Sequence, residues 1–221
     1  MNEYAYRHKS IMRQVLILHR LGIFPPNISP CVDIKAYEQR LPAGAETWFA
    51  IPRWKLVAGT YAKAVEKVLN KLQYARGDLD FSGRIKFLSQ HEHTIKKFEE
   101  ISNQQNGYSI LVIAAQFGWR HRDRSVQKVR EIFTENEFGL GAFEIGCMIL
   151  THPDRFFSDA DLWILCSGNE CNLPGDIPIF TGDIPIFIGH RGKLKFDGGS
   201  PSTIGIKEAY SFYGSPTGFV P

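Results

Sequence analysis

The chain has 221 residues, of which 43% are hydrophobic and 13% aromatic, and its formal net charge is +3. This composition excludes a disordered chain and predicts one globular domain, residues 1–221, with a substantial core. The small net charge excludes a general attraction to polyanions, so an anionic partner would have to meet a local basic patch.

No segment of the sequence is typical of export or of membrane insertion. The apolar run Val15–Leu18 is too short for the core of a signal peptide. The apolar stretch at 138–150 falls short of the ~20 residues that cross a bilayer. The four cysteines are too few for a disulfide framework in a chain of this length. We therefore expect a soluble, cytoplasmic protein without a membrane partner.

The first part of the chain, residues 1–107, is predicted to be mainly helical. Apolar residues recur at helical spacing before Gly22 and again between residues 60 and 77, which predicts two amphipathic helices. A third helix is expected after a capping box that begins at Ser89. The five prolines at 25–53 and the lack of any period there predict an ordered linker with few regular elements.

An α/β core is predicted over residues 108–170. The continuous apolar run at 109–115 is typical of a strand buried on both faces, as in a parallel sheet covered by helices. The segment at 161–166, DLWILC, predicts a second such strand. Helices are expected at 123–134 and, apolar nearly all round and hence central, at 138–150; together these elements predict a right-handed crossover. The expected fold class is α/β, or α+β, with a small, mostly parallel sheet.

The last part of the chain, residues 171–221, is predicted to be rich in β-structure. A hairpin is expected around a turn at 189–192. The phrase GDIPIF occurs twice between residues 174 and 189, seven residues apart. This offset would turn the isoleucines of the two copies to opposite faces of one strand, so the copies cannot form a single regular strand. A duplicated edge element is the favoured interpretation; a metal held by Asp176 and Asp183 is the alternative.

The most suggestive polar segment is QFGWRHRDRS at 116–125, which leaves the first buried strand and enters a helix. Ligands of open α/β sheets bind at the carboxyl ends of the strands, and a helix N-terminus offers free amide groups to an anion. The candidate anion-binding residues are Gln116, Arg120, His121, Arg122 and Arg124. A phosphate, a nucleotide or a nucleic-acid backbone is the expected ligand. The alternative is a solvated loop with Asp123 as a helix cap.

A second polar segment follows the other predicted buried strand. If the two strands are parallel, both polar segments meet at one edge of the sheet. The possible partners in such a site are His152, Ser167, Asn169 and Glu170. Glu170 would then serve as a general base or a metal-binding carboxylate, and an ordinary turn is the alternative.

Other familiar signals are absent or misplaced. The cysteines and histidines of the second half lack the spacing of structural zinc sites, and no HExxH motif occurs. FGLGAFEIG at 138–146 departs from a dinucleotide fingerprint in the position of its third glycine, and close helix packing explains its glycines better. Neither a Walker A loop nor a GxSxG elbow occurs. We expect no metal and no cofactor.

Three stretches carry a resemblance: AAQFGWRHR through ILTHPDRF at 114–156, DLWILCSGNE at 161–170, and the closing YGSPTGF. With them the chain resembles a group of uncharacterised proteins predicted from candidate-phylum bacterial genomes. The resemblance covers roughly the second half of the chain and implies a bacterial, cytoplasmic protein. The group has no assigned activity, so the resemblance implies no functional residue.

Three functions remain open from the sequence. The first is binding of a phosphorylated small molecule or of nucleic acid by the loop at 120–124. The second is an enzyme with a polar site at the carboxyl ends of the strands at 109–115 and 161–166. The third is a structural or protein-interaction module, which predicts an exposed apolar patch.

Overall fold

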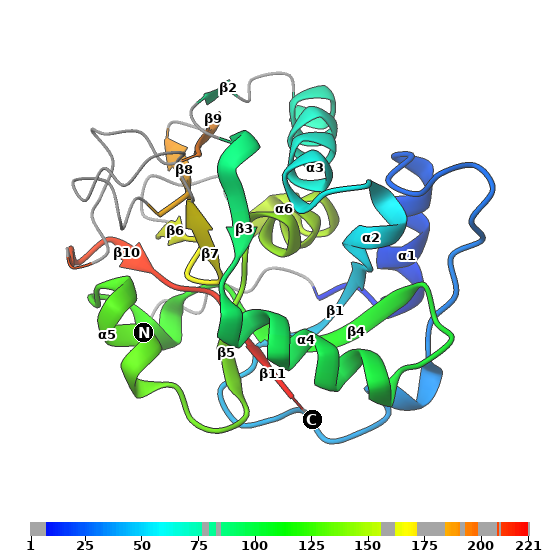
Figure 1. Ribbon diagram of the computed structural model, residues 1–221, viewed down its shortest axis with the longest axis horizontal. Coiled ribbons are helices and arrows are strands. Elements are labelled where there is room, and N and C mark those ends of the chain that lie inside the picture. The colour runs from blue at the N-terminus through cyan, green and yellow to red at the C-terminus, as the bar shows by residue number, and fades with distance from the viewer. Residues whose placement is uncertain are drawn as a thin grey trace.

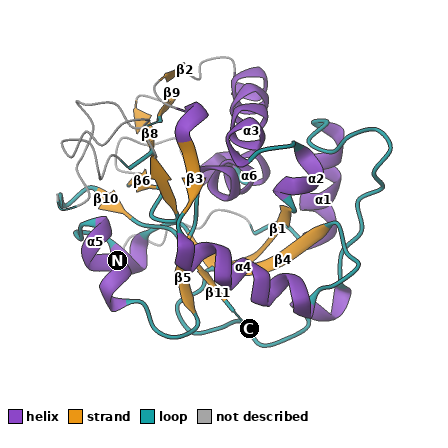
Figure 2. Ribbon diagram, in the orientation of Figure 1, coloured by secondary structure: helices purple, strands orange, loops and turns teal. Residues whose placement is uncertain are grey.

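Helices and strands are interspersed up to residue 155 and only strands are described after it, which gives a mixed α/β structure (Figures 1 and 2). The computed structural model describes residues 8–76, 80–82, 85–155, 162–171, 184–190, 193–198, 207 and 209–220. Its helices are α1 (Ile11–Arg20), α2 (Trp54–Val57), α3 (Tyr61–Arg76), α4 (Glu92–Gln104), α5 (Val126–Ile132) and α6 (Ala142–Thr151). Among the described residues, no helix is long and apolar enough to cross a membrane.

The described strands form three sheets. The four-stranded sheet has the order β1 (Thr47–Pro52), β4 (Ile110–Gln116), β11 (Thr217–Phe219), β5 (Glu137–Gly139). The five-stranded sheet has the order β10 (Tyr213–Gly214), β6 (Trp163–Leu165), β8 (Ile186–His190), β9 (Lys193–Asp197), β2 (Asp80–Ser82). A third sheet pairs β3 (Leu88–Gln90) with β7 (Asn169–Cys171). Each sheet therefore contains a strand from the first 107 residues.

Helix α6 lies near the centre of the molecule, with α3 above it and α1 and α2 to its right in Figure 1. All ten residues of α6 are buried, which confirms the prediction of a central helix from its apolar sequence. The helix packs on α3, α1 and β1. Gly146 permits the close approach of α3, because a Cβ atom at this position would lie 2.4 Å from Val68 Cγ1.

The expectation of a mostly parallel sheet is wrong. Strand β4 is buried at all seven positions, as predicted, but both of its neighbours, β1 and β11, run antiparallel to it. Among the described pairs of strands, β10–β6 and β2–β9 are parallel and the others are antiparallel. A continuous apolar run reports burial on both faces of a strand and carries no information about its direction.

The two predicted buried strands do not form a crossover. The strand expected at 109–115 is β4 in the four-stranded sheet, whereas the strand expected at 161–166 is β6 in the five-stranded sheet. Their carboxyl ends therefore do not share an edge of one sheet. The two polar segments therefore have no common sheet edge at which to form one site.

The first half of the chain is less helical than predicted, because part of the expected linker forms β1. This strand pairs with β4 over its whole length. Pro52 is tolerated because β1 lies at the edge of its sheet. Gln14 of α1 covers that edge: its side chain accepts from the amide of Ala50 at 2.9 Å and donates to the carbonyl of Trp48 at 2.9 Å.

Several predicted helices have shifted ends. Helix α1 ends beside Gly22, as expected, and this glycine adopts the left-handed conformation with φ of 67°. The capping box at Ser89 is wrong, because Ser89 lies in β3 and α4 begins after His91. The His91 Nδ1 atom accepts from the amide of His93 at 3.2 Å. Residues 138–139 belong to β5, so α6 starts four residues later than predicted.

The predicted C-terminal hairpin is present, with β8 and β9 paired antiparallel on either side of residues 191–192, which lie outside the described residues. The first GDIPIF copy lies outside the described residues, as do Asp176 and Asp183. The second copy contributes Ile186 and Phe187 to β8, directly after Pro185. A proline before the first residue of a strand removes no ladder hydrogen bond.

We expect Gly168→Ala to destabilise the fold by about 1–3 kcal/mol, because the added methyl group overpacks a close backbone contact and pushes the two segments of the chain apart. A Cβ atom on Gly168 would lie 2.4 Å from the carbonyl oxygen of Gly139. Gly59→Ala is the matched control, since a Cβ atom on Gly59 would have no heavy atom within 4 Å. Urea denaturation of both variants measures the difference. Equal unfolding midpoints of the two variants would contradict the close contact between Gly168 and Gly139.

Candidate functional site

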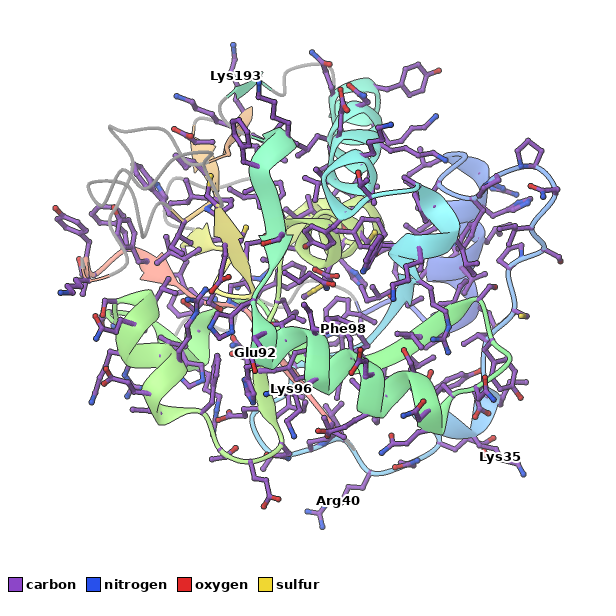
Figure 3. All side chains as sticks on the ribbon, viewed as in Figure 1. Lys35, Arg40, Glu92, Lys96, Phe98 and Lys193 are labelled. Carbon is purple, nitrogen blue, oxygen red and sulfur yellow. The ribbon has the colours of Figure 1, made fainter. Side chains whose placement is uncertain are left out.

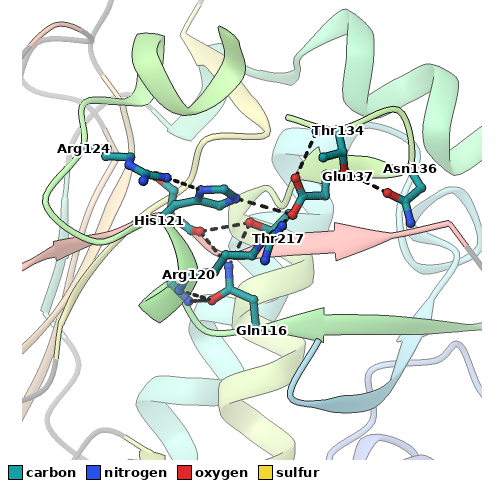
Figure 4. Close-up of polar contacts among 10 residues, drawn as sticks. Gln116, Arg120, His121, Arg124, Thr134, Asn136, Glu137 and Thr217 are labelled. Atoms are coloured by element: carbon teal, nitrogen blue, oxygen red, sulfur yellow. Dashed lines mark hydrogen bonds and ion pairs between the residues drawn. The ribbon is translucent and has the colours of Figure 1, made fainter. Parts of the chain in front are cut away.

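The predicted anion-binding loop surrounds a carboxylate of the protein itself (Figure 4). Arg120 forms an ion pair with Glu137, whose side chain is 1% exposed, and the buried His121 places Nε2 3.7 Å from the same carboxylate oxygen. Burial alone would raise the pKa of Glu137, but the amide of Thr134 and the Arg120 guanidinium lower it below 4.5. Arg120 thus neutralises an interior charge.

The other two arginines of the loop also contact neighbouring side chains. Arg122 Nε donates to Asp123 Oδ2 at 3.2 Å, and the guanidinium of Arg124 lies 3.2 Å from His121 Nδ1. Helix α5 has seven residues and is capped by Ser125, which replaces the cap predicted at Asp123. The loop therefore has the arrangement of a structural turn with two exposed arginines.

Gln116 also has a structural role in this region. Its Nε2 donates to Ser215 O at 3.1 Å and to Thr217 Oγ1 at 2.8 Å, and its Oε1 accepts from the amide of Gly118. These bonds join the end of β4 to the chain that enters β11 (Figure 4). The structure thus brings four predicted site residues, Gln116, Arg120, His121 and Arg124, into one network.

The other predicted partners lie in separate environments. The ring of buried His152 accepts from the amide of Lys9 at 3.2 Å and packs edge-on against Phe49, and burial lowers its pKa to about 4. Ser167 is buried beside Gly139. Glu170 lies on β7 with its side chain 44% exposed and an oxygen 3.7 Å from His91 Nε2.

A different site stands out in the structure: a groove of about 520 Å³ between α2 and α4, a volume within the range of small-molecule pockets. Its apolar lining consists of Pro52, Trp54, Leu56, Ile95, Phe98 and Leu111. Its polar lining consists of Arg53, Lys55, Gln90, Glu99, Ser102 and Glu144. Figure 3 shows Phe98 on α4 near the centre of the view, while Lys35, Arg40 and Lys193 lie at the periphery.

The floor of the groove is a chain of hydrogen bonds that ends at the carboxyl group of Glu144. Trp54 Nε1 donates to Gln90 Oε1 at 3.0 Å, and Gln90 Nε2 donates to Glu144 Oε1 at 3.1 Å. The other oxygen, Oε2, accepts from the Tyr61 hydroxyl at 2.9 Å and from the Gly141 amide at 3.1 Å. Distant segments of the chain thus meet at one carboxyl group.

Glu144 differs electrostatically from Glu137. Burial raises the pKa of Glu144 to about 7, although the hydrogen bonds from its own backbone amide and from Tyr61, Gly141 and Gln90 oppose the rise. Burial and the nearby Glu144 also raise the pKa of Tyr61 well above 10.0, so Tyr61 keeps its proton. A carboxyl group that exchanges its proton near neutral pH, in a groove, has the properties of a functional group.

Asn169 supports this floor. Its Oδ1 accepts from the amide of Ala142 at 2.6 Å, and its Nδ2 donates to the carbonyl of Ser89 at 2.8 Å. Asn169 therefore ties the start of α6 to β3, the two elements that carry Glu144 and Gln90. Asn169 was expected beside the loop at 116–125, and the structure places it next to the groove.

The rim of the groove combines fixed and exposed side chains. Arg53 donates to the carbonyls of Tyr108 at 2.6 Å, Gln105 at 2.7 Å and Ser102 at 3.2 Å, so its side chain is fixed in place by the backbone. Two apolar side chains at the rim, Leu56 and Ile95, are 36% and 40% exposed. Exposed apolar side chains beside a groove are typical of binding surfaces.

The sequence analysis missed Glu144, although a signal was present. Glu144 is the one charged residue in an apolar stretch predicted to form a central helix. A carboxyl group in a helix without a solvent face has to be buried and paired, which marks it as structurally or functionally important. Gln90 and Tyr61 carried no comparable signal, because their role depends on contacts with distant parts of the chain.

Comparisons of the chain with protein-family models, with curated proteins and with solved structures find no match. Among the described residues, no group of three His, Cys, Asp or Glu side chains could hold a metal ion. The groove and its carboxyl group are the features of the described structure that bear on function.

We expect Glu144→Gln to remove a pH dependence of stability. The folded chain holds the Glu144 proton between the ordinary pKa of 4.5 and about 7, where the unfolded chain has released it. The native protein therefore loses stability as pH rises through this window, by roughly 3 kcal/mol, and the variant does not. Urea unfolding at a series of pH values measures the difference between the two proteins.

The controls for this experiment separate Glu144 from other titrating groups. His121 and His152, whose pKa values burial lowers to about 4, act in the opposite direction, but they are common to both proteins and cancel in the difference. Glu131→Gln changes an exposed carboxylate on α5 and serves as the matched control. A difference between native protein and Glu144→Gln that stays constant with pH would contradict the burial of Glu144.

We expect Arg120→Ala to destabilise the fold by about 1–3 kcal/mol, because it leaves the buried carboxylate of Glu137 without its cationic partner. Arg122→Ala is the matched control: it removes an exposed ion pair with Asp123, which contributes little. Thermal or urea unfolding compares the two. If both variants unfold like the native protein, the ion pair is not structural and Arg120 becomes free for a ligand.

Proposed function

We propose that the protein binds a small organic molecule with an apolar body in the groove between α2 and α4. The observation that carries the proposal is the combination of apolar walls with a buried carboxyl group at the floor. Small-molecule sites typically consist of an apolar concavity with a few polar groups that orient the ligand. This groove has both features and a suitable volume of about 520 Å³.

The walls favour a flat or ring-shaped apolar body. Trp54 and Phe98 present aromatic surfaces, and each is held in place by a second ring: Trp54 packs edge-on against Tyr61, and Phe98 against Phe138. A ligand would also cover the exposed side chain of Ile95, and removal of apolar surface from water favours binding by about 25 cal/mol per Å². Rigid walls of this kind lower the entropic cost of binding.

An enzyme is a second candidate, favoured by the pKa of about 7 of Glu144. A general acid–base residue works best when its pKa lies near the working pH, and burial in an apolar environment is the usual way to raise that of a carboxyl group. In this proposal Glu144 transfers a proton to or from the bound ligand. The enzyme site then lies in the groove, away from the strand ends where the sequence placed it.

Anion binding by residues 120–124 stays a prediction, with nucleic acid or a phosphorylated small molecule as partner. Two of its arginines, Arg122 and Arg124, are exposed, but Arg120 is committed to Glu137. A bacterial origin and a cytoplasmic location likewise stay proposals that rest on the sequence.

We expect a neutral aromatic probe, 2-naphthalenemethanol, to bind the native chain with a dissociation constant of about 1 mM, as the size of the probe allows. Binding should shift the NMR signal of the Trp54 indole N–H, which donates to Gln90 at the floor. Trp54→Phe assigns this signal among the four tryptophans. Saturable movement of the signal supports the proposal.

The matched variants place the probe in the groove. Ile95→Glu introduces a charge into the apolar lining and should weaken binding about tenfold, since a charged group loses hydration when an apolar ligand covers it. Leu16→Glu makes the same kind of change on α1, at a side chain that is 37% exposed and lies outside the groove lining, and should leave binding unchanged. Equal affinity of the two variants would reject the groove as the site.

A further inference from the structure

We infer that the ligand of this groove carries an amino group, or another cationic N–H donor, that binds the carboxylate of Glu144. The inference rests on the proposed function and adds the chemical class of the ligand: an aromatic or aliphatic amine with its apolar body against the groove walls. Two properties of the floor support it, its hydrogen-bonding capacity and its charge.

The floor offers an acceptor to a ligand. Two carboxylate oxygens carry about four lone-pair sites. Among the described residues, Gln90 donates to Oε1, Tyr61 and Gly141 donate to Oε2, and the backbone amide of Glu144 itself also stabilises the carboxylate. The carbonyl oxygen of Gln90 is already taken by Trp54. Oε1 accepts one side-chain hydrogen bond, from Gln90, so a ligand donor can add a second one there, whereas a ligand anion would be repelled by the ionised carboxylate.

The ionised carboxylate of Glu144 has no counter-charge, because no ion pair to Glu144 occurs among the described residues. The nearest lining cations are committed elsewhere: Arg53 is fixed on three carbonyl oxygens, and the ammonium group of Lys55 lies 5.6 Å from the centre of the Trp54 ring. A ligand ammonium group would therefore supply the missing counter-charge, and an aromatic side chain such as Phe98 in the lining favours a cation over an anion.

Binding of an amine should depend on pH through Glu144. The titratable groups packed around it are Tyr61 on α3, Cys147 on α6 and Cys166 after β6, and burial raises the pKa of each far above neutrality. The charged groups at the rim are Arg53, Lys55 and Glu99. Because the ammonium group binds the ionised carboxylate, the affinity for an amine should rise as pH increases through the pKa of Glu144, about 7.

Three probes with the same ring system test the inference on the full, native chain: 2-naphthylmethylamine, 2-naphthalenemethanol and 2-naphthoate. Each is titrated at about pH 8 while the Trp54 indole signal is followed, and the amine titration is repeated at about pH 6. We expect the amine to bind about tenfold more tightly than the alcohol, and the carboxylate to bind more weakly than either. The advantage of the amine should shrink at the lower pH.

The variant Glu144→Gln should remove the advantage of the amine while the alcohol still binds. Glu99→Gln, which removes a carboxylate at the rim, is the matched control and should keep the advantage. The comparison of the three probes on the native chain does not depend on the folding of either variant.

The outcomes separate this inference from the proposed function. If the alcohol or the carboxylate binds as tightly as the amine and shifts the Trp54 signal, the groove binds ligands but the inference of an amine is wrong. If none of the three probes shifts the signal, the proposed function fails and the inference fails with it. A preference for the amine that survives Glu144→Gln would also overturn the inference.

Discussion

The carboxyl group of Glu144 sits in a helix that has no face toward solvent, since all ten residues of α6 are buried. A buried carboxyl group needs hydrogen-bond donors, because its desolvation is otherwise costly. The donors come from three places: Tyr61 of α3, Gln90 of β3 and the Gly141 amide at the start of α6 itself. These hydrogen bonds fix α3, β3 and α6 relative to one another.

The groove follows from this arrangement. Gln90 uses both ends of its amide, one on Glu144 and one on the indole of Trp54, so the short helix α2 is held at a set distance from α6. On the other side, Thr94 of α4 donates to the carbonyl of Gly139 at 2.9 Å and anchors α4 to β5. Because α2 and α4 are fixed to different elements, the space between them stays open above the carboxyl group.

Local patterns in the sequence predicted what is local in the fold. The helical periodicity located α1 and α3, and continuous apolar stretches located α6 and β4, because these signals depend on neighbouring residues. The direction and partners of the strands could not be predicted in this way. β11 has three residues and lies between β4 and β5, which are about 80 to 100 positions earlier in the chain, and so short a strand has no pattern of its own.

The same limit applies to the candidate site. The sequence marked the arginines of the loop at 120–124 as a group, but it could not show that Glu137 forms an ion pair with Arg120. The groove joins residues 54, 90, 98 and 144 from four elements, and only the isolated charge of Glu144 within an apolar helix gave a signal. Spacing motifs detect sites built from one segment and miss sites assembled by packing.

The two carboxyl groups that are buried among the described residues, Glu137 and Glu144, differ in how the protein treats their charge. Glu137 has the guanidinium of Arg120 as its partner, its pKa is lowered, and it stays ionised inside the fold. Glu144 has neutral donors, and its pKa is raised to about 7. Removal of the resident cation would leave the carboxylate of Glu137 buried without a counter-charge, which is costly. A carboxyl group held by neutral donors at the floor of an open groove keeps its capacity to exchange a proton and to attract a cation from outside, which is what a binding or catalytic group requires.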